Sequence, residues 1–294
     1  MHHILNCPVC NASSFNEVIT CKDFTVSHEV FSIVECKDCL FKFTNPRPEN
    51  ENIGNYYKSS DYISHSDTKK GIISKLYHLV RNFTLKNKLN LLNKHVSRGT
   101  ILDYGCGTGS FLSVCKKNGW NVFGFEPDRD AAKIANQRGV LVFDNSNELK
   151  NQNLITSFDV ITLWHVLEHV TELNDTLSFL KNNLKKDGIL IIALPNYKSH
   201  DAQIYKEFWA AYDLPRHLYH FDQLSINTLL TKHGFLLTET KPMRFDSFYV
   251  SLLSEKYRNN KNIFFRAFIN GLLSNIKARK SNNYSSLIYI FKHK

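Results

Sequence analysis

The fold of this 294-residue chain is decided by one stretch, Thr100-Ile101-Leu102-Asp103-Tyr104-Gly105-Cys106-Gly107-Thr108-Gly109. An apolar strand ends at an acidic residue, enters a glycine-rich turn and continues into a helical pattern over residues 110–118. Glycines permit a positive φ and let a ligand approach the backbone closely. A strand, a turn of this kind and a helix, in that order, predict an α/β fold with a ligand site at the carboxyl end of a parallel strand.

The spacing of the acidic and glycine residues separates two classes of nucleotide-binding site. A dinucleotide fingerprint would need glycine at position 110, where the chain has Ser110. The observed order is D-x-G-x-G-x-G, and a second strand, 121–125, ends at Glu126. The carboxylate of Asp103 would repel a pyrophosphate but can hold an ammonium group, and Glu126 can accept hydrogen bonds from ribose hydroxyls. These features predict S-adenosylmethionine as the cofactor.

With these motifs, residues 99–294 resemble the class I S-adenosylmethionine-dependent methyltransferases. The resemblance implies a Rossmann-like, seven-stranded, mostly parallel sheet whose last strand is antiparallel. The later strands are expected at 140–143, 157–163, 188–196, 235–240 and 286–291, with a helical insertion at about 245–280 that would form a substrate lid. The residues implied to contact the cofactor are Asp103, Gly105, Gly107 and Gly109 for its methionine part, Glu126 for the ribose, and Asp144, Asn145 and Trp164 for the adenine; Trp164 is equally expected as a core residue.

Two C-x-x-C pairs precede this region. Cys7 and Cys10, and then Cys36 and Cys39, offer four thiolates that suit a closed tetrahedral Zn²⁺ site. A module of this size buries little apolar surface, so a structural zinc would stabilise it. Residues 1–45 are therefore predicted to form a small zinc ribbon; the alternative is four free thiols in a reduced compartment.

The closest resemblance within the class is to bacterial methyltransferases with an N-terminal zinc-ribbon-like segment. It rests on the two cysteine pairs, on Asn45-Pro46-Arg47-Pro48 and on residues 215–221. Between ribbon and core, residues 46–98 are expected to form a helical linker or cap, with apolar residues at helical spacing from 68 to 96. This basic amphipathic segment is expected to pack on the next domain; peripheral contact with an anionic membrane is the alternative.

Two histidine-rich segments are predicted to meet in one chemical site. His165, Glu168 and His169 follow the fourth strand, and Arg216, His217 and His220 follow the fifth. Three interpretations remain open for this group. A histidine can be a general base for the acceptor, Glu168, His169 and His217 can hold a divalent cation, or the residues can organise the loop.

Composition sets the remaining expectations. The net charge is +10, with basic segments at 68–99 and 244–294, and no apolar run is long enough to span a bilayer. Seven cysteines, four of them in C-x-x-C pairs, favour a reduced cytoplasm over a disulfide framework. We expect methyl transfer to a small-molecule or envelope-related acceptor, acidic or sugar-containing, at oxygen. An RNA methyltransferase and a non-catalytic, zinc-stabilised binding protein are the alternatives.

Overall fold

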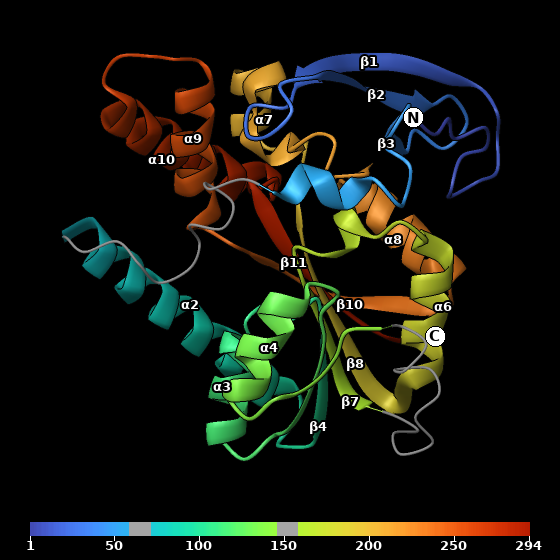
Figure 1. Cartoon of the computed structure of the whole chain (residues 1–294), viewed down its shortest axis with the longest axis vertical. Coiled ribbons are helices and arrows are strands. Elements are labelled where there is room, and N and C mark those ends of the chain that lie inside the picture. The colour runs from blue at the N-terminus through green and yellow to red at the C-terminus, as the bar shows by residue number, and fades with distance from the viewer. Residues whose placement is uncertain (59–71, 146–157) are drawn as a thin grey trace.

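The computed structural model describes residues 1–58, 72–145 and 158–294; for residues 72–79 it describes the backbone only. Two sheets organise the described chain (Figure 1). The larger has seven strands in the order β10-β11-β8-β7-β4-β5-β6. Its strands are β4 (Thr100–Tyr104), β5 (Asn121–Phe125), β6 (Leu141–Phe143), β7 (Phe158–Trp164), β8 (Leu184–Pro195), β10 (Phe235–Pro242) and β11 (Ser286–His293).

All pairings from β6 to β8 are parallel, and β11 runs antiparallel to both β8 and β10. The predicted seven-stranded sheet with an antiparallel last strand is thus confirmed. Apolar side chains alternate between its two faces, as the two-residue period of a strand requires. Ile101, Val160 and Ile191 belong to one core cluster, whereas their neighbours Leu102, Ile161 and Ile192 belong to another.

Helices cover each face of this sheet. Figure 1 shows α2 (Ile72–His95), α3 (Ser110–Lys117) and α4 (Arg129–Gln137) on one side, and α6 (Leu173–Asn183) and α8 (Gln223–Lys232) on the other. Leu89, Leu92 and Phe111 join the cluster on the first face, and Leu177 and Leu229 join the cluster on the second. Helix α2 confirms the predicted helix from residue 72 onward, while residues 68–71 lie outside the described range.

The N-terminal segment shares a sheet with a strand from much later in the chain. Strands β1 (Phe15–Lys22), β2 (Val30–Cys36) and β3 (Lys42–Thr44) form an antiparallel sheet that is completed by β9 (Tyr219–His220). Phe41 and Phe43 pack in the same core cluster as Tyr219 and Phe221. The core of the predicted ribbon is therefore continuous with that of the larger part, so residues 1–45 do not rely on a metal alone for their stability.

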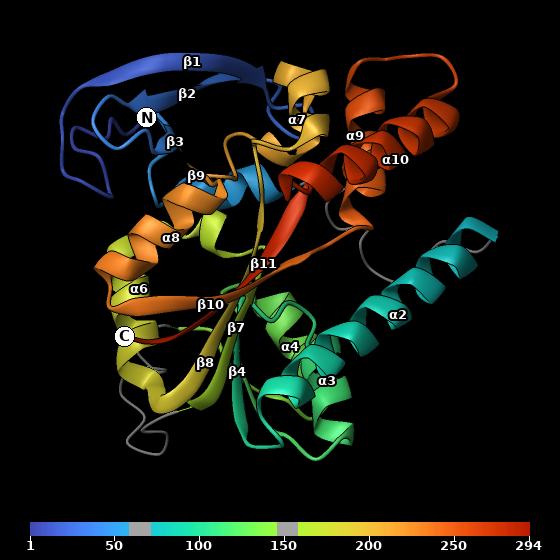
Figure 2. The same cartoon turned by 180° about the vertical axis from the view of Figure 1, so that it is seen from behind.

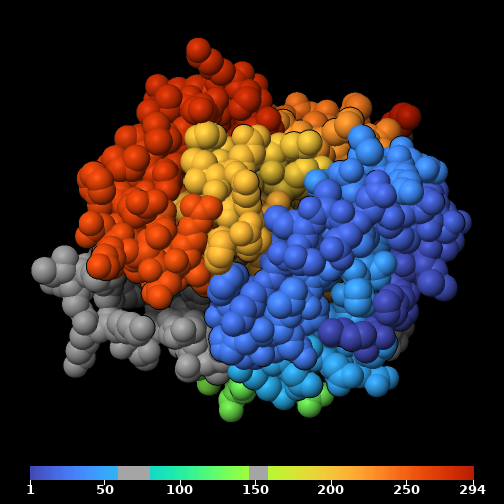
Figure 3. All heavy atoms as spheres, turned by 90° about the horizontal axis from the view of Figure 1, so that it is seen from above, coloured from blue at the N-terminus to red at the C-terminus, as the bar shows by residue number. Residues whose placement is uncertain are grey.

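The carboxyl end of the large sheet carries most of the remaining elements. Figures 1 and 2 show the small sheet, α7 (His200–Tyr205), α9 (Asp246–Tyr257) and α10 (Ile263–Ser281) gathered beyond this end. Seen from above, the N-terminal segment, the α7 region and the α9–α10 pair lie side by side (Figure 3). Short helices η1 (Ile53–Tyr57), η2 (Leu167–His169), η3 (Lys206–Phe208) and η4 (Ala210–Tyr212) connect them. Among the described helices, none has the length and apolar character needed to cross a membrane.

Candidate active site

The order of the strands places the switch point of the large sheet between β4 and β7. Chain connections leave these neighbouring strands in opposite directions, toward β5 and toward β8, and ligands of doubly wound sheets bind where this reversal occurs. The glycine-rich turn follows β4, and His165 follows β7. His165 has a φ of 57°, a left-handed conformation that turns the chain sharply at the end of the strand.

The glycine-rich turn is tight on one side and open on the other. A Cβ on Gly105, whose φ is 79°, would lie 2.5 Å from a methyl of Val166. At Gly107 a Cβ would meet no atom within 4 Å, so this part of the turn faces open space. The Gly107 amide donates to Glu126 Oε2 at 2.7 Å, and the Asp128 amide donates to Oε1 at 3.0 Å. Glu126, whose pKa is raised by burial, is thus held beside the open side of the turn.

Asp103 lies near the carboxyl end of β4. Its side chain is buried and accepts a hydrogen bond from the Thr162 hydroxyl at 2.6 Å. Burial raises the pKa of Asp103 to about 7, against the opposing effects of Thr162 and the Lys88 ammonium. A buried carboxylate of this kind is stabilised by a cation. It therefore suits the ammonium group that the sequence predicts for the cofactor.

Lys88 of α2 lies near Asp103 and was not predicted from the sequence as a site residue. Its Nζ lies over the Trp164 ring, 4.2 Å from the centroid, and near the charges of Asp103 and Asp246. Burial lowers the pKa of Lys88. The Trp164 ring also meets Phe111 edge-on, with centroids 5.6 Å apart. Trp164 is therefore packed between α2 and α3, as the core alternative of the sequence interpretation expected.

Asp144 and Asn145 follow β6, next to the end of β5 where Glu126 lies. Both are exposed, and Asp144 forms an ion pair with Arg129 Nε at 3.6 Å. Their place at the strand end agrees with the predicted contact to an adenine. That contact stays a prediction.

The histidine-rich segments do converge. Ligand atoms of Glu168, His169 and His217 all lie within 4.8 Å of one another. His169 Nδ1 lies 3.1 Å from the Arg216 carbonyl oxygen and 2.9 Å from the Tyr57 hydroxyl, and His217 Nδ1 lies 2.9 Å from the Ala211 carbonyl oxygen. Because a carbonyl only accepts, each Nδ1 is the donor in its contact with the carbonyl oxygen.

Glu168 is the buried carboxylate of this group. Its side chain is 1% exposed, and neither carboxylate oxygen accepts a hydrogen bond within the described chain. Burial, together with nearby His169, holds the pKa of His217 well below its usual range, so this imidazole is neutral. A buried carboxylate requires a cation or a proton, and the described chain supplies one such group in His165, whose Nδ1 lies 3.4 Å from Glu168 Oε1.

His165 lies beside this group in a different protonation state. Its Nε2 is 3.1 Å from Asp246 Oδ2, and its Nδ1 is 3.4 Å from Glu168 Oε1. Although burial favours the neutral ring, the two carboxylates raise the pKa of His165 to about 9. An imidazolium has no lone pair with which to accept a proton. His165 in this state therefore forms ion pairs and does not act as a general base. Asp246, at the start of α9, is a second residue that the sequence interpretation missed.

His220 forms its hydrogen bond with Thr44 of β3 and not with Glu168, His169 or His217. The Thr44 hydroxyl donates to the His217 carbonyl oxygen at 2.6 Å, which leaves its oxygen to accept from His220 Nε2 at 3.1 Å. Burial lowers the pKa of His220 to about 3. His220 thus fastens β9 to β3.

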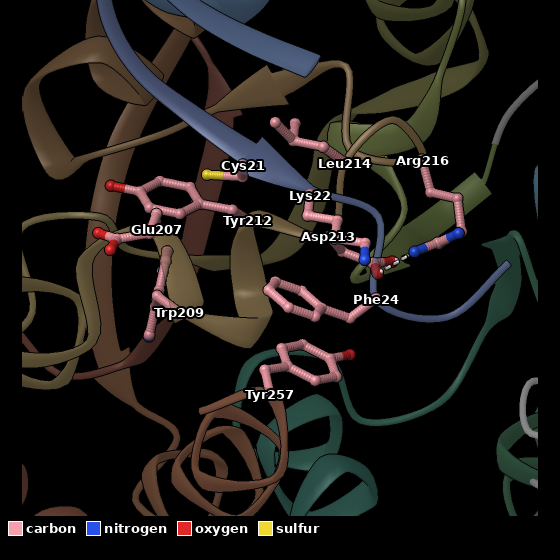
Figure 4. Close-up of a pocket in the computed structure, with 10 residues that line it drawn as sticks. All are labelled: Cys21, Lys22, Phe24, Glu207, Trp209, Tyr212, Asp213, Leu214, Arg216 and Tyr257. Atoms are coloured by element: carbon pink, nitrogen blue, oxygen red, sulfur yellow. Dashed lines mark hydrogen bonds and ion pairs between the residues drawn. The ribbon is translucent and has the colours of Figure 1, made fainter. Parts of the chain in front are cut away.

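Arg216 is also directed away from the cluster. Figure 4 shows its guanidinium paired with Asp213 in a hollow between the N-terminal segment, η4 and α9, and Nη2–Oδ1 is 2.7 Å. The same nitrogen lies 3.0 Å from Asp23 Oδ1, and the Arg216 side chain is 1% exposed. Arg216 therefore joins the small sheet to the larger part and is not placed to meet an acceptor.

The four predicted zinc ligands come together beside β2. The sulfur atoms of Cys7, Cys10, Cys36 and Cys39 all lie within 4.8 Å of one another. Sγ–Sγ distances are 3.5 Å for Cys7–Cys39 and for Cys10–Cys36. Burial raises the pKa of Cys7 to about 11. A four-thiol shell of this size fits Zn²⁺, which would also hold the thiols in their deprotonated form.

Comparison with known proteins places the fold and the central sequence in one group. A family model described as a methyltransferase domain matches residues 76–240, which is more than half of the chain. The magnesium protoporphyrin IX methyltransferase of Synechocystis, solved with bound SAH, aligns with a TM-score of 0.55 at 15% identity. The alignment covers 84% of this chain and all of that one. This likeness concerns the fold.

The curated relatives in this comparison are O-methyltransferases of ubiquinone biosynthesis. The protein from Rickettsia typhi is 28% identical over 152 residues, which cover 47% of this chain and 59% of that protein. The protein from Rickettsia canadensis is 26% identical over 201 residues, covering 63% and 84% of the two chains. The first alignment thus spans well under two thirds of its relative.

Proposed function

Because this chain belongs to the methyltransferase domain family and is a class I S-adenosylmethionine-dependent enzyme, we propose that it methylates a hydroxyl oxygen of a small molecule. The convergence of Glu168, His169 and His217 at the carboxyl end of β7 is the observation that carries this proposal. The names of the ubiquinone-biosynthesis relatives support oxygen as the acceptor atom and a small molecule over an RNA.

The proposed cofactor position follows from the glycine-rich turn. Gly107 offers the open surface on which the methionine part would lie, flanked by Gly105 and Gly109, with Asp103 facing its ammonium group. Glu126, already oriented by the Gly107 and Asp128 amides, would bind the ribose hydroxyls. Asp144 and Asn145 would lie beside the adenine.

Glu168, His169 and His217 are proposed to hold a divalent cation and to position the acceptor. Both imidazoles direct a lone pair away from a carbonyl-bound Nδ1, the arrangement usual for metal-ligating histidines. Two nitrogens and one carboxylate suit Zn²⁺ or Mn²⁺ better than Mg²⁺. A bound cation would lower the pKa of the acceptor hydroxyl. His165 would neutralise charge at Glu168, and in-line alignment with the sulfonium methyl would provide much of the rate.

A structural Zn²⁺ in the Cys7, Cys10, Cys36 and Cys39 shell completes the proposed cofactor set. This site is closed by its four thiolates, so it would have no open position for a substrate. Its expected contribution is to fasten the N-terminal loops to β2.

His217→Ala tests the role of the cluster. We expect turnover with a catechol-type or other small phenolic acceptor to fall by roughly 10²–10⁴-fold, with SAH affinity within about twofold of the wild type. In equilibrium dialysis, Mn²⁺ binding should be lost in His217→Ala and in Glu168→Gln. His233→Ala, at the end of α8, is the matched control. Unchanged turnover in His217→Ala would remove the cluster from the chemistry, and unchanged Mn²⁺ binding would remove the cation.

A further inference from the structure

The α9–α10 pair exposes an apolar face that the methyltransferase chemistry does not use. On α10, six large apolar side chains are between 39% and 69% exposed: Phe264, Phe265, Phe268, Leu272, Leu273 and Ile276. The three phenylalanines are 68%, 69% and 57% exposed. This α10 apolar face lies outside the region matched by the family model, residues 76–240.

Helix α10 is fixed in this orientation by the packing of its opposite side. Ala267, Gly271, Ser274 and Ala278 are its buried residues, and they recur at helical spacing. A Cβ on Gly271 would lie 2.9 Å from the Phe248 Cα atom. The helix therefore cannot rotate to bury its large side chains without driving them into the backbone of α9.

Buried polar contacts hold the same orientation. Asp201 of α7 accepts from the Ser274 hydroxyl at 2.6 Å and from the Trp209 indole at 2.8 Å. Glu255 of α9 accepts from Asn270 at 3.0 Å and from Arg266 at 3.1 Å. These contacts tie the small-residue side of α10 to its neighbours, so the apolar face is a fixed feature of the surface.

Exposed charge around the α10 apolar face is of one sign. From residue 244 to residue 281 the exposed charged side chains are all basic: Arg244, Lys256, Lys261, Arg266, Lys277, Arg279 and Lys280. The two acidic residues of this segment are committed elsewhere, Asp246 to His165 and Glu255 to the buried contacts above. Apposing two copies of this surface would bring like charges together, whereas an anionic bilayer would supply both opposite charge and an apolar interior.

We propose that the α10 apolar face docks the protein on the surface of an anionic lipid bilayer. The phenylalanines would lie at the boundary between headgroups and acyl chains, and the basic side chains would contact lipid phosphates. Helix α9 begins at Asp246, 3.1 Å from His165, so docking would bring the candidate active site near the membrane surface. The proposal differs from the sequence expectation, which assigned membrane contact to the helix at 68–96. It does not depend on the acceptor.

Vesicle sedimentation of the full chain tests the proposal. We expect the wild type to sediment with phosphatidylcholine–phosphatidylglycerol vesicles at about 0.1 M salt, to be largely released at about 1 M salt, and to ignore pure phosphatidylcholine. Phe265→Ser/Phe268→Ser should weaken binding at least about tenfold. Arg279→Gln/Lys280→Gln should weaken it by about 25-fold, since each basic residue contributes about fivefold.

Matched controls use exposed residues on other elements. Leu224→Ser on α8 removes an equally exposed apolar side chain, and Lys117→Gln/Lys133→Gln removes two exposed charges from α3 and α4. Both variants should bind like the wild type. No sedimentation of the wild type at low salt, or wild-type binding by the Phe265→Ser/Phe268→Ser pair, would overturn the proposal. A dimer in light scattering that this pair abolishes would also overturn it, in favour of self-association.

Discussion

At the scale of single residues, the buried guanidinium of Arg216 joins the small sheet to the larger part of the molecule. Arg216 contacts Asp23 at the end of β1 and Asp213 beside η4, and its Nη1 donates to the Tyr56 carbonyl oxygen at 2.9 Å. Although burial opposes ionisation, hydrogen bonds from Arg216 and from the Ser27 and Thr25 amides hold the pKa of Asp23 well below its usual range. Arg216 thus acts through structure and not through the acceptor.

Asp23→Asn should destabilise the chain by about 3 kcal/mol at pH 7, because the variant leaves a buried guanidinium short of one partner. The folded pKa of Asp23 lies below its unfolded value of about 3.9, so its stabilisation is present above that value and lost as the pH falls. In urea unfolding, the difference from the wild type should therefore begin to shrink below about pH 4 and keep shrinking as the pH falls toward the lower, folded pKa.

Asp38→Asn, at an exposed position in the loop after β2, is the control and should leave the free energy of unfolding nearly unchanged at both pH values. A difference between wild type and Asp23→Asn that is independent of pH would contradict the ion-pair account.

At the scale of elements, close approach of α9 and α10 explains why α10 buries its small side chains. Gly271→Val should lower the free energy of unfolding by about 1–3 kcal/mol, since its side chain would overlap Phe248. Gly54→Val in η1, where a Cβ meets nothing within 4 Å, should cost much less. Equal losses for both variants in urea unfolding would show that the contact between the two helices contributes little.

The cysteine shell is the second element whose role is testable. Cys36→Ser should lower the zinc content of the purified chain by about one ion and lower its melting temperature, because three ligands bind far more weakly than four. Metal analysis and calorimetry would measure both. Cys21→Ala, a buried cysteine outside the shell, should keep its zinc. A zinc content in Cys36→Ser equal to that of the wild type would contradict the assignment.

Local patterns were enough to predict the elements that surround the proposed cofactor position. The strand at 121–125, the glycine-rich turn and the position of Glu126 all follow from neighbouring residues, and the structure has them as expected. Helices α9 and α10 were likewise visible as periodic segments.

Contacts between segments far apart in the chain could not be predicted this way. Lys88 meets Asp103 and Trp164 only because α2 docks on α3, and Asp246 reaches His165 across 81 positions. The two-residue strand β9 has no sequence signature, and its pairing with β3 made the N-terminal segment part of a larger core. Helical periodicity in α10 marks an apolar face, but which face is buried is decided by the fit of Gly271 against Phe248.

At the scale of the whole molecule, three groups of elements meet beyond the carboxyl end of the large sheet. The small sheet, the α7 region and the α9–α10 pair surround the end at which Asp103, Glu126 and the histidine cluster lie (Figures 1 and 3). Among these elements, β1, β2, β3 and the α9–α10 pair lie outside residues 76–240, the region that the family model matches. Differences in acceptor between related enzymes are expected to reside in these elements.

Isothermal titration of SAH into the wild type, Glu126→Ala and the exposed control Glu17→Ala is the most direct test of this account. We predict that Glu126→Ala weakens SAH by roughly 30- to 1,000-fold, as expected for the loss of two charge-assisted hydrogen bonds to the ribose. Glu17→Ala, on β1, should match the wild type. Equal SAH affinity in all three proteins would contradict the placement of the cofactor beside Glu126.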